Sequence, residues 1–378
     1  LSPEFAVYNG LPGRRGELDD YSPEGLAARN DLDRSTLREL DGVEAADDVD
    51  RVTVAAMRER LGVGLDLADA GEDLRSLNNI DSPVQTLRDG FDNLPTATEE
   101  DWADFASALR AVPRALDQYA RSLRLARSRG DVAARRQVGA AISQARDQAG
   151  EATSSYTALI DGAATADGAP LPPALAAELR EAAAVARRGY ARLADFLAEE
   201  ILPEAGRADA VGRERYERFS REFLGAVVDL DETYEWGRER LAAIDAEQRA
   251  IAERLYGPGT GVREAMDRLN ADPARTVHGT AALRDWMQQT SDRAMAALDG
   301  VHFDIPAPLR TLECRIAPSA TGGIYYTGPS DDFSRPGRMW WSVPAGTEDF
   351  ATWQERTTVF HEGVPGHHLQ VGMQTHLR

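Results

Sequence analysis

The sequence predicts a mainly α-helical protein, in which a large multi-helix bundle carries a small antiparallel β-sheet next to a C-terminal helix, an α+β fold dominated by helices. Two observations support this prediction. Apolar residues recur at helical spacing from about residue 31 to about residue 300, whereas β-branched and aromatic residues gather between residues 301 and 346. The 378 residues include 42% hydrophobic ones, enough to bury a substantial core.

The helical pattern is clearest in the segment that begins at Thr98. This hydroxyl can cap a helix whose first turn is acidic, where the partial positive charge of the helix end favours carboxylates. Apolar residues then follow at three- and four-residue spacing on one face: Trp102, Phe105, Leu109, Val112, Leu116 and Tyr119. We therefore expect a helix from Thr98 to about Gly130, with a kink at Pro113.

Other helices are expected in the ranges 133–150, 172–202, 212–255 and 280–298, within a helical body that spans residues 31–300. Pro172 and Pro173 suit the first turn of a helix. Residues 1–30 are expected to form an N-terminal extension, which could include a tag remnant at residues 1–5.

A small antiparallel sheet of two or three strands is expected within residues 301–346. The candidate strands are 309–316, 323–327 and 339–343, and Gly and Pro clusters at 317–323 and 328–337 indicate turns between them. The last segment, 347–378, is expected to be one interrupted helix that Thr347 caps, with Glu348 and Asp349 in its first turn.

Charge and composition exclude several classes of partner. The net charge of −20 would repel nucleic acids and anionic lipid surfaces. The sequence contains no apolar run of about 18 residues, the length that a membrane-spanning helix requires. Cys314 is the only cysteine, so no intrachain disulfide can form, and it is expected to pack as a small apolar side chain. These features favour a cytoplasmic protein, with a secreted or lipoprotein form as the alternative if a leader was removed. The oligomeric state is not readable from the sequence.

Candidate metal ligands gather near the C-terminal end, in the sequence His-Glu-Gly-Val-Pro-Gly-His-His at residues 361–368. A histidine followed directly by glutamate on a helix is how zinc hydrolases place a ligand beside a base: His361 would bind the metal, and Glu362 would activate water. The alternative is a solvated histidine patch, but the apolar stripe before the pair, the Pro-Gly break after it and the double histidine favour one divalent metal ion.

The spacing of the histidines requires a break in this helix. In a regular helix, six residues amount to about 9 Å of rise and a turn of about 240°, so His367 would point away from His361. His368 would return to the same face, but about 10.5 Å along the axis. Pro365 and Gly366 allow a bulge or break that brings His367 back, which makes His367 the preferred second ligand. His368 is an alternative ligand or faces the substrate.

Residues of the predicted sheet could assist the metal. Tyr325 and Tyr326 alternate faces on a strand, so one of them could donate a hydrogen bond to a developing oxyanion, although structural packing is the favoured role for either residue alone. Arg335 and Arg338, and also Arg315, could hold a substrate carboxylate through bidentate contacts, or could form ion pairs on the surface.

The sequence resembles the bacterial family of domains of unknown function 885, whose members are similar to helical gluzincin metallopeptidases. Three motifs carry the resemblance: Tyr-Tyr-Thr-Gly-Pro-Ser at 325–330, Arg-Pro-Gly at 335–337, and the decapeptide at 361–370. The resemblance implies a helical body around a small sheet, a zinc ion held by His361 and one of the paired histidines, Glu362 as the base, and peptides or other amides as substrates.

The chain departs from the gluzincin pattern at the third ligand. Gluzincins take a glutamate from a downstream helix, but no acidic residue follows Glu362. We expect the chain to be a fragment of a longer protein that lacks this ligand. The alternatives are an upstream ligand, Glu355 or Glu313, or a replacement by His376.

Three classes of function remain open at this point. The first is a zinc metallopeptidase or other amide hydrolase, which as a fragment could be inactive. The second is a degenerate or non-peptidase member that binds or modifies a small amine or carboxylate ligand in a biosynthetic pathway. The third is a helical scaffold, in which the histidine cluster is incidental.

Overall fold

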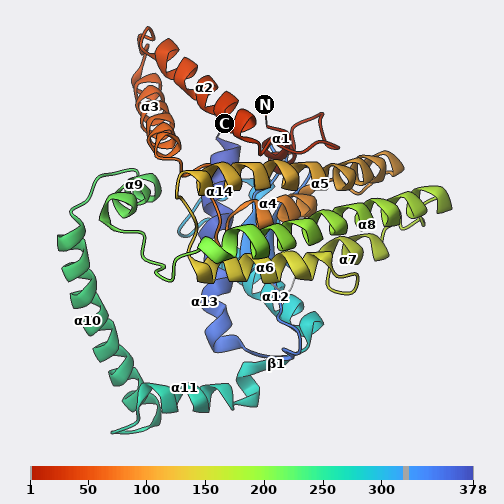
Figure 1. Cartoon of the computed structure of the whole chain (residues 1–378). Coiled ribbons are helices and arrows are strands. Elements are labelled where there is room, and N and C mark those ends of the chain that lie inside the picture. Colours follow the sequence, from red (N-terminus) through yellow and green to blue (C-terminus); the bar gives the residue numbers. More distant parts are fainter. Residues whose placement is uncertain (1, 318–322, 378) are drawn as a thin grey trace. The chain divides into compact units, whose positions relative to one another are not determined.

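The computed structural model describes residues 2–317 and 323–377, and it divides the chain into two compact units. The N-terminal unit consists of Ser2–Glu4 and Arg14–Thr233, and the C-terminal unit of Phe5–Gly13 and Tyr234–Arg378. Helices dominate both units, which confirms the predicted α+β class (Figure 1). The boundary lies inside the range 31–300, and each unit has a hydrophobic core of its own.

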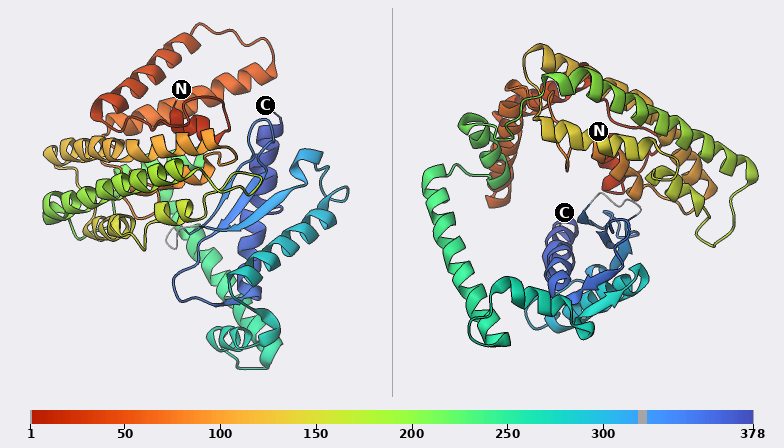
Figure 2. Two further views of the ribbon diagram at one scale, coloured as in Figure 1. Left: turned by 90° about the vertical axis from the view of Figure 1, so that its right-hand side faces the viewer. Right: turned by 60° about the horizontal axis from the view of Figure 1, so that its bottom comes forward.

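The N-terminal unit is entirely helical. Its helices are α2 (Pro23–Leu40), α3 (Asp48–Asp69), α4 (Pro83–Asp89), α5 (Glu99–Ser128), α6 (Arg135–Ala149), α7 (Ser155–Asp161), α8 (Pro173–Phe196) and α9 (Arg213–Leu224), with a π-helical turn at Leu197–Ile201 and short 3-10 turns at Gly90–Asn93 and Leu202–Glu204. Figures 1 and 2 show α5, α6 and α8 side by side, and their facing sides form the core of this unit.

Helix α5 shows why these segments are helical. The Thr98 hydroxyl accepts from the backbone N–H of Asp101 at 3.1 Å, and the Asp101 carboxylate accepts from the backbone N–H of Thr98 at 2.9 Å, a capping box. Every residue of the predicted apolar face is buried. Pro113 lies inside α5, and Gly189 of α8 packs against it. The predicted helix is confirmed.

The C-terminal unit combines helices with two small sheets. Its helices are α10 (Leu230–Tyr256), whose first residues belong to the other unit, α11 (Val262–Asn270), α12 (Thr280–Leu298), α13 (Thr352–Glu362) and α14 (Gly366–His376). The helical range expected at 212–255 is two helices, because α9 ends at Leu224 and the next residue, Gly225, adopts a left-handed conformation with φ of +66°. Helix α1 (Pro3–Tyr8) buries Ala6 and Val7, so the expected tag remnant at residues 1–5 overlaps an ordered helix.

The three-stranded sheet corrects the expectation of an antiparallel sheet. Its order is β2 (Leu312–Ile316), β4 (Gly337–Trp341), β3 (Ile324–Thr327), and β4 is parallel to β2 but antiparallel to β3. The outer strands run in opposite directions, so a strand inserted between them must be parallel to one of them. The turn expected at 317–323 lies mostly outside the described residues.

The second sheet corrects the start of the last helical segment. Strands β1 (Thr276–His278) and β5 (Asp349–Ala351) pair antiparallel, and α13 begins only at Thr352. The first helical turn expected at Glu348 and Asp349 is therefore wrong. Asp349 pairs with His278 of β1 in this sheet, and its carboxylate lies 2.9 Å from Nδ1 of His278.

The core of the C-terminal unit lies where α12, the three-stranded sheet, α13 and α14 meet. Its buried members include Leu283, Met287, Leu309, Leu312, Cys314, Met339, Trp341, Val359, Val364 and Leu369. Cys314 is 5% exposed, in keeping with an apolar packing role. Residues of both α13 and α14 are therefore anchored in this core.

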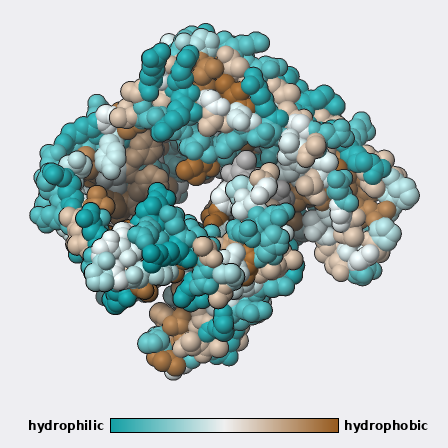
Figure 3. All heavy atoms as spheres, turned by 90° about the horizontal axis from the view of Figure 1, so that it is seen from below, coloured by the Kyte–Doolittle hydropathy of each residue, from teal (hydrophilic) through white to brown (hydrophobic). Residues whose placement is uncertain are grey.

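Polar surface dominates the face of the molecule in Figure 3, where hydrophobic side chains form scattered patches. Among the described residues, none of the helices combines the length and the apolar character needed to cross a bilayer.

Candidate metal centre

Two glycines shape the break between α13 and α14. Helix α13 ends at Glu362, residues 363–365 form the link, and α14 begins at Gly366. A Cβ at position 363 would lie 2.6 Å from the Val359 carbonyl oxygen, and one at position 366 would overlap the His361 carbonyl oxygen. Only glycine permits both close approaches. The predicted interruption of the helix is present, and Val364 fixes the link in the core with 0% exposure.

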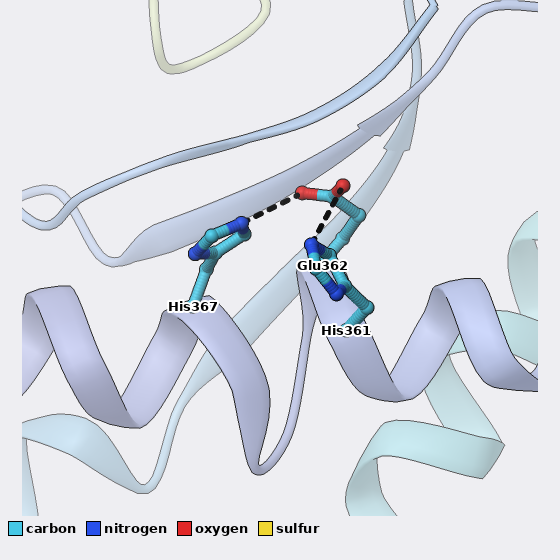
Figure 4. Close-up of side chains that lie close together, drawn as sticks. All are labelled: His361, Glu362 and His367. Atoms are coloured by element: carbon cyan, nitrogen blue, oxygen red, sulfur yellow. Dashed lines mark ion pairs between the residues drawn. The ribbon is translucent and has the colours of Figure 1, made fainter. Parts of the chain in front are cut away.

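The break brings His361 and His367 to one place, with the Glu362 carboxylate next to both (Figure 4). Nε2 of His361 lies 3.9 Å from one carboxylate oxygen of Glu362, and Nε2 of His367 lies 3.8 Å from the other. The two imidazole ring centres are 4.8 Å apart. The potential ligand atoms of all three residues lie within 4.8 Å of one another.

The three side chains differ in their exposure to solvent. The side chain of His361 is 69% exposed, that of His367 38%, and that of Glu362 only 13%. Burial raises the pKa of Glu362 above its usual value, and the nearby His367 and His361 offset part of this rise. The carboxylate is therefore the sheltered member of the cluster, and a ligand from solvent would reach His361 first.

The donor set suits a divalent transition metal. Two imidazole nitrogens and a carboxylate oxygen are typical zinc ligands, and bonds to them are about 2.0–2.2 Å long. Donor atoms within 4.8 Å of one another can converge on one ion through small rotations of the side chains. Across residues 2–317 and 323–377, no fourth His, Cys, Asp or Glu joins this group.

His368, the alternative ligand, lies outside this group because both of its ring nitrogens contact other groups. Its Nε2 donates to the Leu309 carbonyl oxygen at 2.7 Å, and its Nδ1 lies 2.9 Å from the Tyr326 hydroxyl. The side chain is fully buried, which lowers the pKa of His368. The geometry therefore favours His367 over His368 as the second ligand.

The two tyrosines of β3 face opposite sides of the sheet. The Tyr326 ring lies against α14, with its centre 6.4 Å from that of His367, and burial raises the pKa of Tyr326 above its usual value. The Tyr325 ring stacks on Trp340 at 6.1 Å. Of the two residues, only Tyr326 is placed near the histidines.

The arginines expected to bind a substrate carboxylate have partners within the protein. Arg338 and Arg315 both contact the carboxylate of Glu313, at 2.9 and 2.8 Å. Arg335 donates to the Tyr8 carbonyl oxygen at 2.8 Å, and burial lowers the pKa of Arg335. A substrate carboxylate would have to compete with these contacts.

The three candidates for a third ligand lie outside the cluster. Glu313 is engaged by Arg315 and Arg338, and the ring of His376 packs against that of Phe333 at 6.1 Å. Glu355 is half-buried on α13, where burial raises the pKa of its carboxyl group.

Two groups at the site were missed by the sequence analysis. The first is the Leu309 carbonyl oxygen, which no side-chain pattern could reveal because it is a backbone atom. The second is Gly337 in β4, where a Cβ would lie 2.7 Å from Nδ1 of His368. The motif Arg-Pro-Gly at 335–337 was a signal for this position, but its contact with His368 depends on the strand order.

Comparisons with known proteins identify the fold and the family. The crystal structure of a putative lipoprotein from Colwellia psychrerythraea matches 98% of this chain and 69% of its own, with a TM-score of 0.79 and 17% identity. A putative lipoprotein of unknown function from Shewanella oneidensis matches 98% of this chain and 68% of its own, with a TM-score of 0.59 and 14% identity. At these identities the matches establish the fold alone. A search of curated proteins found no match. The model of a family described as bacterial proteins of unknown function (DUF885) matches residues 3–378, so the chain belongs to the DUF885 family.

Proposed function

We propose that this chain carries the catalytic centre of a zinc-dependent hydrolase that cleaves peptide or other amide bonds. The observation that supports the proposal is the cluster of His361, Glu362 and His367, whose ligand atoms lie within 4.8 Å of one another at a break between two helices. The succession of His361 and Glu362 on one helix matches the first two residues of the His-Glu-x-x-His motif of zinc metallopeptidases, and His367 approaches this pair across the helix break instead of from four residues further along the same helix.

In this proposal His361 and His367 bind the metal, and Glu362 acts as the general base and then as the general acid. A bound zinc ion would supply Lewis acidity, which polarises a carbonyl group and lowers the pKa of water. Glu362 accepts a proton from the attacking water as the water oxygen bonds to the carbonyl carbon. When the C–N bond breaks, Glu362 returns that proton to the departing amine. The low exposure of the Glu362 side chain suits a group that must hold a proton between these steps.

A second candidate function follows from the number of ligands. Catalytic zinc sites commonly have three protein ligands, and within the described ranges only Glu362 stands next to the two histidines. If Glu362 completes the ligand set, it cannot serve as the base. The centre would then bind or modify a small amine or carboxylate ligand without hydrolysis.

One set of variants separates these candidates. The wild-type chain is expected to bind about one equivalent of zinc and to cleave members of a mixture of short peptides, measured by elemental analysis and mass spectrometry. Glu362→Gln should keep the zinc and lose cleavage by about 10²-fold or more, because the proton acceptor is gone. His367→Ala should lose zinc, and the exposed His302→Ala should change neither property. Loss of zinc in Glu362→Gln would instead support the second candidate, and full cleavage by this variant would refute the role of the base.

The cytoplasmic location stays a prediction. Two of the similar solved structures are described as putative lipoproteins, which favours the exported form for this chain as well. Cell fractionation of the source organism distinguishes the two.

A further inference from the structure

The hydrogen bonds of His368 determine which of its nitrogens carries a proton. The Leu309 carbonyl oxygen can only accept, so Nε2, at 2.7 Å, must donate to it. In the neutral ring Nδ1 is then the acceptor, and the Tyr326 hydroxyl donates to it across 2.9 Å. With 0% exposure, the His368 side chain has no contact with solvent that could replace either bond.

This pair places the Tyr326 ring beside the metal cluster. The ring is nearly parallel to that of His367, at an angle of 26° and a centre distance of 6.4 Å. It meets the His368 ring edge-on, at 73° and 5.8 Å. Tyr326 therefore packs on one proposed metal ligand and hydrogen-bonds to the next residue in sequence.

Gly337 leaves the space that this pair occupies. It is the first residue of β4, which pairs with β3, the strand of Tyr326. A Cβ at position 337 would overlap the Tyr326 hydroxyl and would lie 2.7 Å from Nδ1 of His368. Any larger residue at position 337 would push the Tyr326 hydroxyl and the His368 ring apart. Glycine at this position of β4 therefore leaves room for their hydrogen bond.

We infer that His368 is a positioning residue for the proposed hydrolase: it holds the Tyr326 side chain beside His367, so that the phenol can serve a substrate bound at the cluster. The inference rests on the proposed function and extends it. The Tyr326 hydroxyl has one proton, which the tautomer argued above assigns to the bond with Nδ1 of His368. To donate to a negative oxygen of the substrate, the hydroxyl turns this proton from His368 to the substrate, while the ring stays in place.

Two substitutions of His368 separate its two hydrogen bonds. An asparagine oxygen can replace Nδ1 as the acceptor for Tyr326, whereas a glutamine nitrogen can replace Nε2 as the donor to Leu309. His368→Gln should therefore lower kcat by about 10-fold or more, with KM changed less than about 3-fold. His368→Asn should retain most of the wild-type kcat. Equal damage by both variants would mean that the residue is only structural.

A double-mutant cycle tests whether His368 acts through Tyr326. Tyr326→Phe should lower kcat by about 10²-fold, as the loss of an oxyanion donor does. Adding His368→Gln to Tyr326→Phe should then have little further effect, because residues that act as one unit are not additive. Multiplication of the two effects would overturn the inference. Zinc content should equal that of the wild type in each variant, and its loss from His368→Gln would make His368 a ligand instead.

A measurement without substrate separates this inference from the proposed function. In the chain labelled with ¹⁵N-histidine, the His368 resonances should show a neutral ring protonated at Nε2. Tyr326→Phe and Gly337→Ala should each shift the Nδ1 resonance and leave Nε2 bound to its proton. A ring protonated at Nδ1, or an Nδ1 resonance that neither variant moves, would refute the pairing. If the wild-type chain binds no zinc and cleaves no peptide, the proposed function fails, while these spectra still decide whether His368 accepts the hydrogen bond of Tyr326.

Discussion

Replacing Gly366 by alanine should disrupt the metal centre without removing any ligand. The new Cβ would lie 2.6 Å from the Phe360 carbonyl oxygen and would overlap that of His361. Close carbon–oxygen contacts begin at about 3.3 Å, so the start of α14 must move away from α13 by roughly 0.7 Å or more. Metal–ligand distances tolerate only about 0.2 Å. The side-chain rotation that brings His367 onto the ion would then also have to absorb this shift, which would weaken binding.

We expect Gly366→Ala to bind zinc about 100-fold more weakly than the wild-type chain, a loss of about 2.7 kcal/mol. Competition with a chromogenic chelator measures the affinity, and circular dichroism checks that the helices persist. Gly139→Ala is the matched control, because a Cβ there meets nothing within 4 Å and the residue lies within α6. Wild-type zinc affinity in Gly366→Ala would refute the reasoning that this glycine sets the distance between the two histidines.

Two further predictions concern the two cores. Leu109→Ala should lower the free energy of unfolding of the N-terminal unit by about 2–5 kcal/mol in urea, because Leu109 is 0% exposed and its truncation leaves a cavity. The control Leu32→Ala, at a residue that is 65% exposed, should change this free energy by less than about 0.5 kcal/mol. Equal effects of the two substitutions would contradict the assigned core. Burial raises the pKa of Cys314 to about 12, so the thiol should stay unreactive toward Ellman's reagent at pH 8 until the chain is unfolded, and rapid labelling of the native protein would show that Cys314 is accessible.

The sequence predicted best those features that depend on local patterns. The apolar face of α5 and its cap at Thr98 were readable because helical periodicity and capping involve residues close in sequence. The position of β4 between β2 and β3 was not readable, because strand order depends on contacts between distant segments. For the same reason Asp349 was assigned to a helix, although β1, more than 70 residues earlier, holds it in a strand.

The candidate site shows the same division. The break at Pro365 and Gly366 was predicted from residue chemistry, and it led to the preference for His367 over His368. The partners of His368 could not be predicted, because one is the backbone oxygen of Leu309 and the other, Tyr326, is brought to it by the sheet. Which arginines remain available for a substrate was equally hidden, since Arg338 and Arg315 share Glu313.

The location of the two histidines on different helices would give the proposed metal ion a mechanical role. His361 belongs to α13 and His367 to α14, and the two helices are joined by only three residues. An ion bound by both rings would act as a cross-link that sets the angle between the helices. Because ligands that bind only the folded state stabilise it, an ion present at 100 times its dissociation constant would add about 2.7 kcal/mol to folding. Without the ion, only the packing of Val364 and the other core residues would set this angle, and the core of the N-terminal unit would be unaffected.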